Sequence, residues 1–335
     1  VDMSANPIGV AVAGLGFGEK VHLPALSVNP DLEAVALWHP RRERLDQACA
    51  THGLAGYDDW DALLADPAVS AVVIATPPAP RFDLARRALA AGKHLLLEKP
   101  VAFVVDQVRE LQRLALQKGL VVGVDYEYRA VPLFMHTQRM LQAGAIGTPW
   151  LVRLDWLMSS RSDPSRGWNW YSQASQGGGV IGALGTHAMD ILAWLIGPLS
   201  GVQALNATSI HERPLDEGGM ATVDSEDVSL IQARLQWQGR ADSLVPAQIN
   251  LASVARHGRG CWLEVYGSEG TLILGSPNQK DYVHGFALQH AAAGEALRAI
   301  EADADLAFET TWADGRIAPV ARVQGWWAES IRSGR

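Results

Sequence analysis

The stretch IGVAVAGLGFGEKVHLPAL, residues 8–26, decides the fold class of this chain. Its first six residues are small and aliphatic, which is typical of a strand buried on both faces. Three glycines follow directly, at Gly14, Gly16 and Gly18. Glycine at a strand end permits a tight turn and lets the main chain approach a ligand at the start of the next helix. The stretch therefore predicts a strand, a glycine-rich turn and a helix.

The next hundred or so residues repeat this alternation of strand and helix signals. Further short aliphatic runs, each predicting a buried strand, lie at residues 33–38, 71–76, 94–98 and 120–124. Amphipathic segments with apolar residues at three- and four-residue spacing lie between them, at residues 43–53, 60–67, 81–93 and 106–119. Such an alternation indicates a parallel sheet whose strands are joined by right-handed helical crossovers.

The pattern changes after about residue 125 and predicts a second domain of another class. Helices are expected over residues 132–143 and around His187. Longer strands are predicted at residues 148–158, 202–210, 228–237, 247–255, 261–267 and 271–275. Two polar spacers, residues 211–227 and 275–285, are expected to be exposed and poorly structured. We therefore expect an α/β chain, with a Rossmann domain over residues 1–125 and an α+β domain with a mostly antiparallel sheet over residues 126–335.

The glycine turn, with Phe17 inside it, is the candidate dinucleotide site. Gly14 permits the turn, and Gly16 lets the main chain approach a pyrophosphate at the helix N-terminus. The strict G-x-G-x-x-G pattern has a small residue where this chain has Glu19, so Gly18 is the candidate for the packing role. The strand and helix signals on both sides favour nucleotide binding over a bare structural turn.

The end of the second predicted strand bears on the choice of cofactor. A site for NAD usually has Asp or Glu about 20 residues beyond the glycines, where the carboxylate accepts a hydrogen bond from the ribose. This chain has His39 there, followed by Arg41 and Arg42. Guanidinium groups without a carboxylate suit a 2′-phosphate, so NADP(H) is favoured over NAD(H). The alternative is that both arginines only begin a solvated helix.

Composition and charge exclude several classes of protein. The chain has 335 residues, of which 48% are hydrophobic, and two globular domains are the default at this length. A net charge of −8 argues against nucleic acid or an anionic membrane as a partner. Two cysteines and ten scattered histidines form no ligand motif, so no metal site is expected. We see no apolar run of about 20 residues and no signal peptide, so a cytoplasmic protein is expected.

With these motifs in place, the chain resembles the Gfo/Idh/MocA oxidoreductase family over essentially its whole length. The glycine turn is followed, in the family's order, by Thr76-Pro77-Pro78, Glu98-Lys99-Pro100, the stretch GAIGTPWLVRLDW at residues 144–156, and GGGVIGALGTHAMD at residues 177–190. The resemblance implies hydride transfer between NAD(P)(H) and a small carbonyl or hydroxyl compound, such as a sugar or polyol. It also implies that the mostly antiparallel sheet of residues 126–335 is large and open, and that a homodimer or homotetramer forms through it.

The resemblance assigns roles around the Glu98-Lys99-Pro100 motif. Lys99 would lie beside the nicotinamide and the substrate, where an ammonium group stabilises a developing alkoxide. Glu98 would help to hold the cofactor or orient Lys99. The loop Thr76, Pro77 and Pro78 would line the cofactor. Arg81 stands where the family usually has His, and it is expected either to contact a cofactor phosphate or to lie at the surface.

The family also places a D-x-x-x-H pair on the helix after the glycines. His187 matches the histidine, whereas Ala183 stands where the aspartate would be, one helical turn earlier. A histidine there can transfer the reaction's proton or bind substrate, because its ordinary pKa lies near neutral pH. The alternative is an ordinary histidine packed in a core.

Further aromatic and basic residues are candidate substrate contacts. Tyr126 and Arg129 follow the strand predicted at residues 120–124, where the family often has substrate or cofactor contacts. Arg166, Trp168 and Trp170 precede the glycines, and aromatic planes there suit stacking on a ring. For all five residues, packing within their own loops is the alternative.

Two other functions stay open from the sequence. The missing carboxylate at Ala183 would suit a nucleotide-binding sensor that no longer catalyses, although Lys99 and His187 are intact. A branch of the family cleaves glycosides by using the nicotinamide transiently, and such an enzyme would retain its cofactor through turnover.

Overall fold

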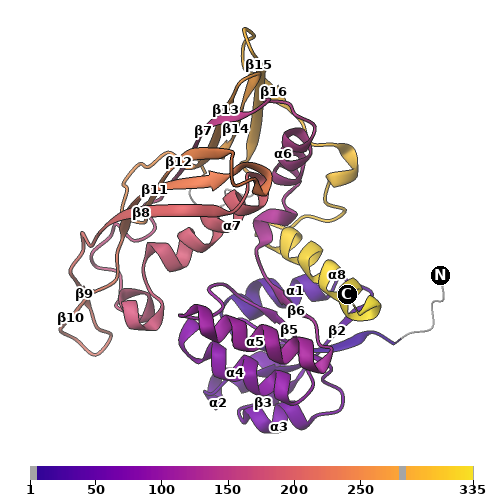
Figure 1. Cartoon of the computed structure of the whole chain (residues 1–335). Helices are drawn as coiled ribbons and strands as arrows, with labels where there is room; N and C mark the ends of the chain where they lie inside the picture. Colours follow the sequence, from indigo (N-terminus) through magenta and orange to yellow (C-terminus); the bar gives the residue numbers. More distant parts are fainter. Residues whose placement is uncertain (1–5, 279–283, 335) are drawn as a thin grey trace. The chain divides into compact units, whose positions relative to one another are not determined.

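The computed structural model describes residues 6–278 and 284–334. The chain divides into two compact units, Val1–Glu127 with Thr310–Arg335 and Tyr128–Glu309 (Figure 1). The sequence analysis placed the boundary after residue 125 and all later residues in the second domain. The structure differs at the C-terminus, because helix α8 (Ile317–Ser333) buries Ile317 and Val320 against Val21 and Ala25 of the first unit.

The first unit is a six-stranded parallel sheet of order β3-β2-β1-β4-β5-β6. Its strands are β1 (Ile8–Ala13), β2 (Leu32–Trp38), β3 (Ala55–Tyr57), β4 (Ala71–Ile74), β5 (His94–Leu97) and β6 (Val122–Val124). Its helices are η1 (Gly18–His22), α1 (Leu23–Leu26), α2 (Arg42–His52), α3 (Trp60–Ala65), α4 (Pro78–Ala90) and α5 (Val105–Lys118), besides α8. This confirms the predicted Rossmann architecture, and the sequence analysis missed only the short edge strand β3 among these strands.

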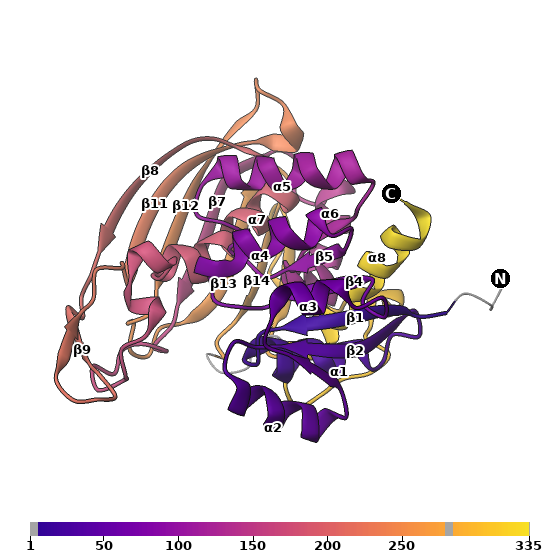
Figure 2. The same cartoon turned by 90° about the horizontal axis from the view of Figure 1, so that it is seen from below.

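The parallel sheet brings the candidate residues of this unit to one edge. Strand β4 is fully buried and β5 is buried except at His94, as their aliphatic sequences predicted. Figure 2 shows α3, α4 and α5 along one face of the sheet, while α8 packs with α1 and η1. The strand order reverses between β1 and β4, and ligands of such sheets bind at the carboxyl ends of the strands near this reversal.

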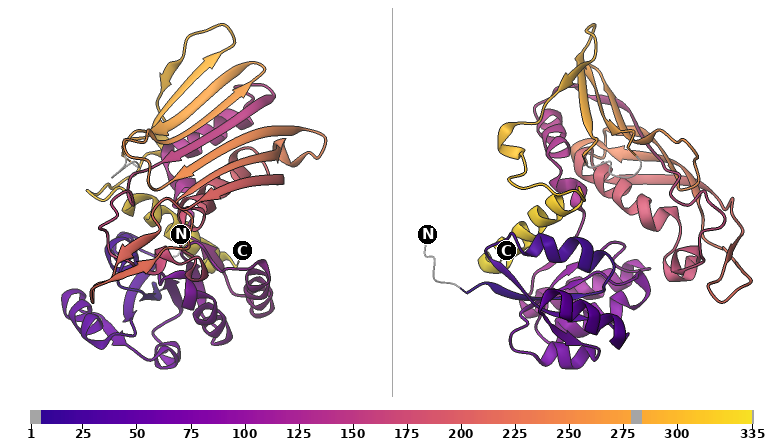
Figure 3. Two further views of the ribbon diagram at one scale, coloured as in Figure 1. Left: turned by 90° about the vertical axis from the view of Figure 1, so that its left-hand side faces the viewer. Right: turned by 180° about the vertical axis from the view of Figure 1, so that it is seen from behind.

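The second unit is built on an eight-stranded sheet of order β16-β15-β14-β13-β7-β12-β11-β8 (Figure 3). Its strands are β7 (Pro149–Leu157), β8 (Leu199–Ala207), β11 (Val228–Gln236), β12 (Leu244–Ala252), β13 (Gly260–Gly267), β14 (Gly270–Ser276), β15 (Ala287–Ala292) and β16 (Arg298–Ile300). All neighbouring pairs are antiparallel except β12 with β7. The mostly antiparallel open sheet is therefore confirmed.

Helices α6 (Pro132–Gln142) and α7 (Thr186–Leu195) supply apolar side chains to the core on one face of this sheet. Strands β11 and β12 alternate buried and exposed residues, so their other face is open to solvent. The stretch Ala174–Leu195, which ends in α7, is long and apolar enough to cross a membrane by length and composition alone, a point that the sequence analysis missed. One such stretch is weak evidence for a membrane span, because core helices of soluble proteins pass the same test.

One expectation about the spacers was wrong in part, because most of residues 211–227 are exposed but the segment is structured. Residues 211–227 were expected to be exposed and poorly structured, but they contain the hairpin β9 (Glu212–Pro214) and β10 (Met220–Thr222). The side chain of Arg213 is buried, and its guanidinium group donates hydrogen bonds to the main-chain carbonyls of Arg161 and Asp163. In the other spacer, residues 275–285, positions 279–283 lie outside the described residues.

Candidate cofactor and substrate site

The glycine turn after β1 requires glycine at two of its positions, Gly14 for its conformation and Gly18 for its close packing. Gly14 has a φ of 106°, and a Cβ there would lie 2.6 Å from the carbonyl oxygen of Ala75. A Cβ on Gly18 would lie 2.9 Å from Cγ1 of Val12, so this glycine lets the helical turn pack on β1. A Cβ on Gly16 would meet nothing within 4 Å. The turn therefore fits a dinucleotide, because its main chain is open on the side where a pyrophosphate would lie.

A cluster of basic side chains lies at the carboxyl end of β2. His39 Nδ1 accepts a hydrogen bond from Arg41 N at 3.0 Å, and Arg44 Nη2 reaches the carbonyl oxygen of Leu15 in the glycine turn at 3.5 Å. Burial lowers the pKa of His39, and the charges of Arg44 and Arg41 lower it further. The His39 imidazole is thus disfavoured as a cation beside two guanidinium groups.

Arg41 and Arg42 differ in what they contact. Arg42 forms ion pairs with Asp46 at 2.9 Å and Asp58 at 3.7 Å, both of which are exposed. The side chain of Arg41 is exposed next to His39. Arg41 is therefore the better placed of the two predicted residues to meet a phosphate at the end of β2.

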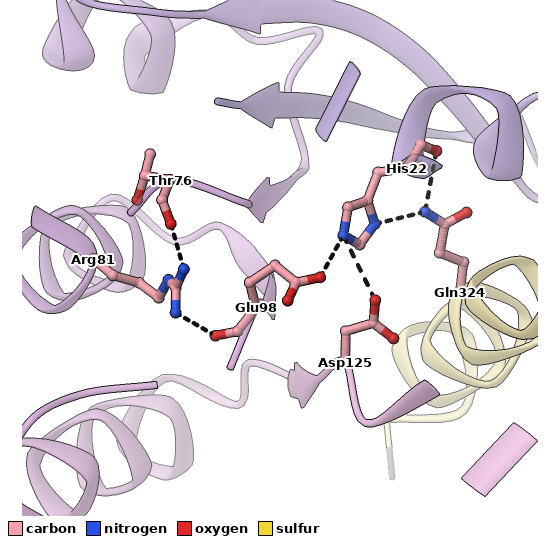
Figure 4. A network of polar contacts seen from close by, with 6 residues as sticks. All are labelled: His22, Thr76, Arg81, Glu98, Asp125 and Gln324. Carbon is pink, nitrogen blue, oxygen red and sulfur yellow. Dashed lines mark hydrogen bonds and ion pairs between the residues drawn. The ribbon is translucent and has the colours of Figure 1, made fainter. Parts of the chain in front are cut away.

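Arg81 is not at the surface, which was one of its two expected positions, because its side chain is buried (Figure 4). The guanidinium group donates to the carbonyl oxygen of Glu98 at 2.8 Å and to those of Thr76 and Pro100. Burial lowers the pKa of Arg81 to about 10, against the opposing effect of the Glu98 charge. Arg81 therefore ties the loop after β4 to the loop after β5, and these loops carry the predicted residues Thr76 and Lys99.

His22, Glu98 and Asp125 form a buried group beside this tie (Figure 4). His22 Nε2 lies 3.0 Å from Glu98 Oε1 and 3.6 Å from Asp125 Oδ2. Burial raises the pKa of Glu98, but the hydrogen bond and charge of His22, together with Lys99, more than offset it and lower the pKa overall. Burial and the charges of Glu98 and Glu127 hold the pKa of Asp125 well above its usual range.

Glu127 adds a third buried carboxyl to this edge of the sheet. Burial, and then the charge of Glu98, raise the pKa of Glu127 to about 7, whereas the charge of Lys99 opposes the shift. Lys99 is half-buried and follows Glu98 directly. The structure thus surrounds the predicted catalytic lysine with carboxyl groups of unequal acidity, an arrangement that is common at functional sites.

His22, Asp125 and Glu127 of this group were not predicted from the sequence, nor was Gln324, whose Nε2 lies 3.2 Å from His22 Nδ1, and no metal site was expected. His22, Glu98 and Asp125 come from three separate segments, and their potential ligand atoms lie within 4.8 Å of one another among the described residues. We interpret the group as hydrogen-bonded, because His22 Nε2 already lies at hydrogen-bond distance from Glu98. The available signal was His22 itself, a polar residue inside the apolar run of residues 21–26.

In the second unit, His187 lies near the start of α7 and is 4% exposed. Its ring stands edge-on to Tyr128, with centroids 4.9 Å apart, and 6.1 Å from the ring of Trp156. Ala183 lies one turn earlier in the π-helical segment Ile181–Gly185. His187 is therefore held by aromatic packing at a helix whose first turn is widened.

Of the two predicted contacts after β6, Arg129 is engaged within its own unit. Its guanidinium group makes a two-point ion pair with Asp190 on α7, at 2.8 and 2.6 Å, and lies over the ring of Trp194. Tyr126 belongs to the first unit and is half-buried. Arg129 thus braces α7 three residues beyond His187, which differs from the predicted direct substrate contact.

In the loop before the glycines, two of the three predicted residues donate hydrogen bonds to main-chain carbonyls of the second unit. Arg166 Nη1 donates to the carbonyl oxygen of Ser160 at 2.6 Å, and Trp168 Nε1 donates to that of Thr222 at 2.9 Å. Trp170 is 37% exposed and its ring lies 5.8 Å from that of Tyr171. Only the Trp170 ring therefore presents a large exposed face among these three residues.

Comparison with known proteins assigns the family. Residues 8–126 match the oxidoreductase family with an NAD-binding Rossmann fold, and residues 134–273 match the Gfo/Idh/MocA C-terminal domain. The chain belongs to the Gfo/Idh/MocA family, which confirms the resemblance seen in the sequence. It is an oxidoreductase with an NAD(P)-binding Rossmann unit.

Individual relatives extend over nearly the whole chain. An uncharacterised oxidoreductase of Synechocystis is 42% identical over 99% of this chain and 89% of its own length. Levoglucosan dehydrogenase of Pseudarthrobacter phenanthrenivorans is 28% identical over 85% of this chain and 77% of its own length. The solved apo form of a levoglucosan dehydrogenase superposes with a TM-score of 0.87 at 24% identity, covering 98% of this chain and 91% of that one, and so shows the shared fold.

Proposed function

We propose that the protein is an NADP(H)-dependent dehydrogenase or reductase that acts on a sugar or polyol derivative. The observation that carries the proposal is the open glycine turn at one edge of the parallel sheet, with Lys99 among buried carboxyl groups at the same edge. A cofactor that binds at such an edge has its reactive end close to the carboxyl ends of the neighbouring strands.

The basic end of β2 supports the choice of NADP(H). His39, Arg41 and Arg44 lie together there, and no carboxylate takes the strand-end position. The neighbouring acidic groups Asp46 and Asp58 are paired with Arg42 instead. A ribose 2′-phosphate would place its charge among guanidinium groups, whereas NAD would find no acceptor for its 2′-hydroxyl at that position.

The relatives support a carbohydrate or polyol as substrate. Several are named as dehydrogenases of levoglucosan, D-xylose, D-glucosides and scyllo-inositol. A dehydrogenase oxidises a hydroxyl group of its substrate to a carbonyl group, with the nicotinamide cofactor as the hydride acceptor. For this chain, Tyr126 and Trp170 remain candidate substrate contacts, because Tyr126 is half-buried and the Trp170 ring is exposed.

The chemistry that we propose divides between two residues. The nicotinamide cofactor, when bound, supplies or accepts the hydride. The Lys99 ammonium donates a hydrogen bond to the reacting oxygen and stabilises its negative charge. His187, buried at the start of α7, is the candidate for proton transfer that the second unit offers.

A turnover assay tests the proposal. Purified protein would be incubated with NADP⁺ or NAD⁺ and levoglucosan, D-xylose, methyl glucosides or scyllo-inositol, and nicotinamide absorbance followed. We expect turnover with at least one compound, and a loss of about a thousandfold or more in Lys99→Met with cofactor affinity kept. Lys118→Met, at the exposed end of α5, is the matched control. Tight cofactor binding without turnover on a broad panel would instead favour a sensor, and release of free sugar without net redox would favour a glycoside hydrolase.

We also propose that the open face of the large sheet joins copies of this chain. Val202 and Leu205 of β8 are 64% and 68% exposed, and Leu230 of β11 is 47% exposed. Leu205→Glu should lower the mass measured by light scattering if this face forms an interface, whereas Leu116→Glu on α5 should not. We propose a cytoplasmic location as well, because Cys49 and Cys261 are both free thiols, as is usual in a reducing compartment.

A further inference from the structure

Gln324 of the C-terminal helix contacts the buried group next to Lys99 (Figure 4). Its side chain is fully buried, and its Nε2 lies 3.2 Å from both the carbonyl oxygen and Nδ1 of His22. A main-chain carbonyl can only accept a hydrogen bond, so the amide nitrogen must face it. The second hydrogen of that nitrogen then points at Nδ1, which acts as the acceptor.

This contact fixes the ring of His22. With Nδ1 accepting from Gln324, the ring hydrogen of a neutral imidazole lies on Nε2. Nε2 donates to Glu98 Oε1 at 3.0 Å. A rotation of the His22 ring would break this bond or the bond from Gln324. His22 therefore transmits the position of α8 to the carboxylate of Glu98.

Glu98 is held at two points as a result. Its carboxylate accepts from His22, and its main-chain carbonyl accepts from Arg81 at 2.8 Å. All four residues, including Gln324, are buried to 9% exposure or less. Buried hydrogen bonds of this kind are costly to break, because each leaves a polar group without a partner.

We propose that Gln324 and His22 are positioning residues for Lys99, acting through Glu98. The inference rests on the proposed function, in which the Lys99 ammonium contacts the reacting oxygen. Lys99 follows Glu98 in the chain, so a shift of the Glu98 main chain, which these two contacts hold in place, moves the base of the lysine side chain. Misplacement of a catalytic group by about 1 Å can cost about a hundredfold in rate.

Kinetics of matched variants test the proposal. Gln324→Met keeps the volume but removes the donor, and His22→Leu removes both ring contacts. We expect kcat to fall by about tenfold to a hundredfold in each, with NADPH affinity within twofold of wild type. His22→Gln keeps a donor that can reach Glu98 and should recover part of the loss, which a merely structural role would not predict. Arg332→Gln removes the α8 ion pair to Asp31, and His94→Gln replaces a half-buried histidine outside this group, so both serve as controls.

Two readouts need no substrate and separate this inference from the proposed function. Histidine ¹⁵N NMR of the wild-type protein should show His22 with hydrogen on Nε2. Pulse labelling with a small amine-reactive reagent, read by peptide mass spectrometry, should show a Lys99 labelling rate changed by about fivefold or more in Gln324→Met. If no compound is turned over, the proposed function fails while these two measurements still decide the inference.

Three results would overturn the inference. These are a His22 ring with hydrogen on Nδ1, a Gln324→Met variant whose Lys99 labelling and kcat both match wild type, and one bound equivalent of a divalent metal in the purified protein, which would make the three side chains ligands. If Gln324→Met does not fold, the wild-type NMR measurement remains decisive.

Discussion

Arg81 Nη1 donates to the carbonyl oxygen of Glu98 at 2.8 Å, and this single bond joins residues 17 apart in the sequence. The same guanidinium group also donates hydrogen bonds to the carbonyl oxygens of Thr76 and Pro100. These three hydrogen bonds of a charged side chain all go to main-chain carbonyl oxygens in two loops. The loops that carry Thr76 and Lys99 consequently share one buried hydrogen-bond donor, the Arg81 guanidinium group.

Arg81→Met should destabilise the protein by about 3 kcal/mol or more, because three buried carbonyls lose a charged donor. Urea unfolding followed by tryptophan fluorescence measures the change. Arg86→Met, on the same helix but exposed and paired with Asp83, should cost less than about 1 kcal/mol. Equal effects of the two variants would contradict the assigned role of Arg81.

Gly16→Ala should leave folding intact and weaken cofactor binding by about tenfold or more. The added Cβ meets nothing within 4 Å in the structure, but it would fill the space that a pyrophosphate needs. Fluorescence titration with NADPH measures the loss. Gly14→Ala is the contrasting variant, since its positive φ and the close Ala75 carbonyl should lower stability as well. Unchanged NADPH affinity in Gly16→Ala would show that the dinucleotide lies elsewhere.

Arg41→Ser should weaken NADPH binding by about tenfold while leaving NADH binding nearly unchanged, because a charge-assisted bond to phosphate is lost. Arg42→Ser should have a smaller effect, since Arg42 is paired with Asp46 and Asp58. Parallel titrations with the two cofactors give the ratio. If wild type prefers NADH by more than tenfold, the choice of NADP(H) is wrong.

His187→Asn should lower kcat by about a hundredfold or more, because a proton-transfer group is removed. NADPH affinity should stay the same. His211→Asn, an exposed histidine in the same unit, is the matched control. A kcat within threefold of wild type would make His187 an ordinary packed histidine, as its contacts with Tyr128 and Trp156 also allow.

Stability should fall as pH rises from about 4.5 to about 7, because of Glu127. Burial, followed by the charge of Glu98, raises the pKa of Glu127 from 4.5 to about 7, so the folded state binds a proton that the unfolded state releases. The stabilisation is fully present below pH 4.5 and is lost as pH rises to about 7. Glu127→Gln should flatten this slope and raise stability at pH 8 by at most about 3 kcal/mol.

Urea unfolding at a series of pH values checks that slope. Asp125, whose pKa is also raised, adds a loss of the same sign, and the opposing groups near Glu127 are Lys99 and Arg316. Glu43→Gln on the exposed face of α2 is the control and should not change the slope. An identical pH dependence in Glu127→Gln and wild type would contradict the prediction.

Much of the fold could be predicted because its elements carry strong local signals. Strands buried on both faces, such as β4 and β5, are continuous aliphatic runs, and α5 ends at Gly119 in the left-handed conformation. Strand β3 has three residues at the sheet edge and leaves no such pattern. The placement of α8 depends on contacts with residues about 300 positions earlier, which no local pattern reports.

The candidate site was predictable only where a motif names its residues. The glycine turn and Glu98-Lys99-Pro100 are contiguous in the sequence, so they could be found. Arg81 could not be read as buried, because charged residues are almost always exposed and its acceptors are main-chain carbonyls of distant loops. Gln324 and Asp125 become part of the group only through tertiary packing.

The return of α8 to the first unit also fixes when that unit can be finished during synthesis. Gln324 follows His22 by 302 residues, so the whole second unit leaves the ribosome before their bond can form. Domains usually fold in the order in which they emerge. Here the contacts of α8 with the first unit must wait for the last helix, and a nascent chain interrupted before residue 317 would carry every motif of the dinucleotide site while His22 still lacked its bond to Gln324.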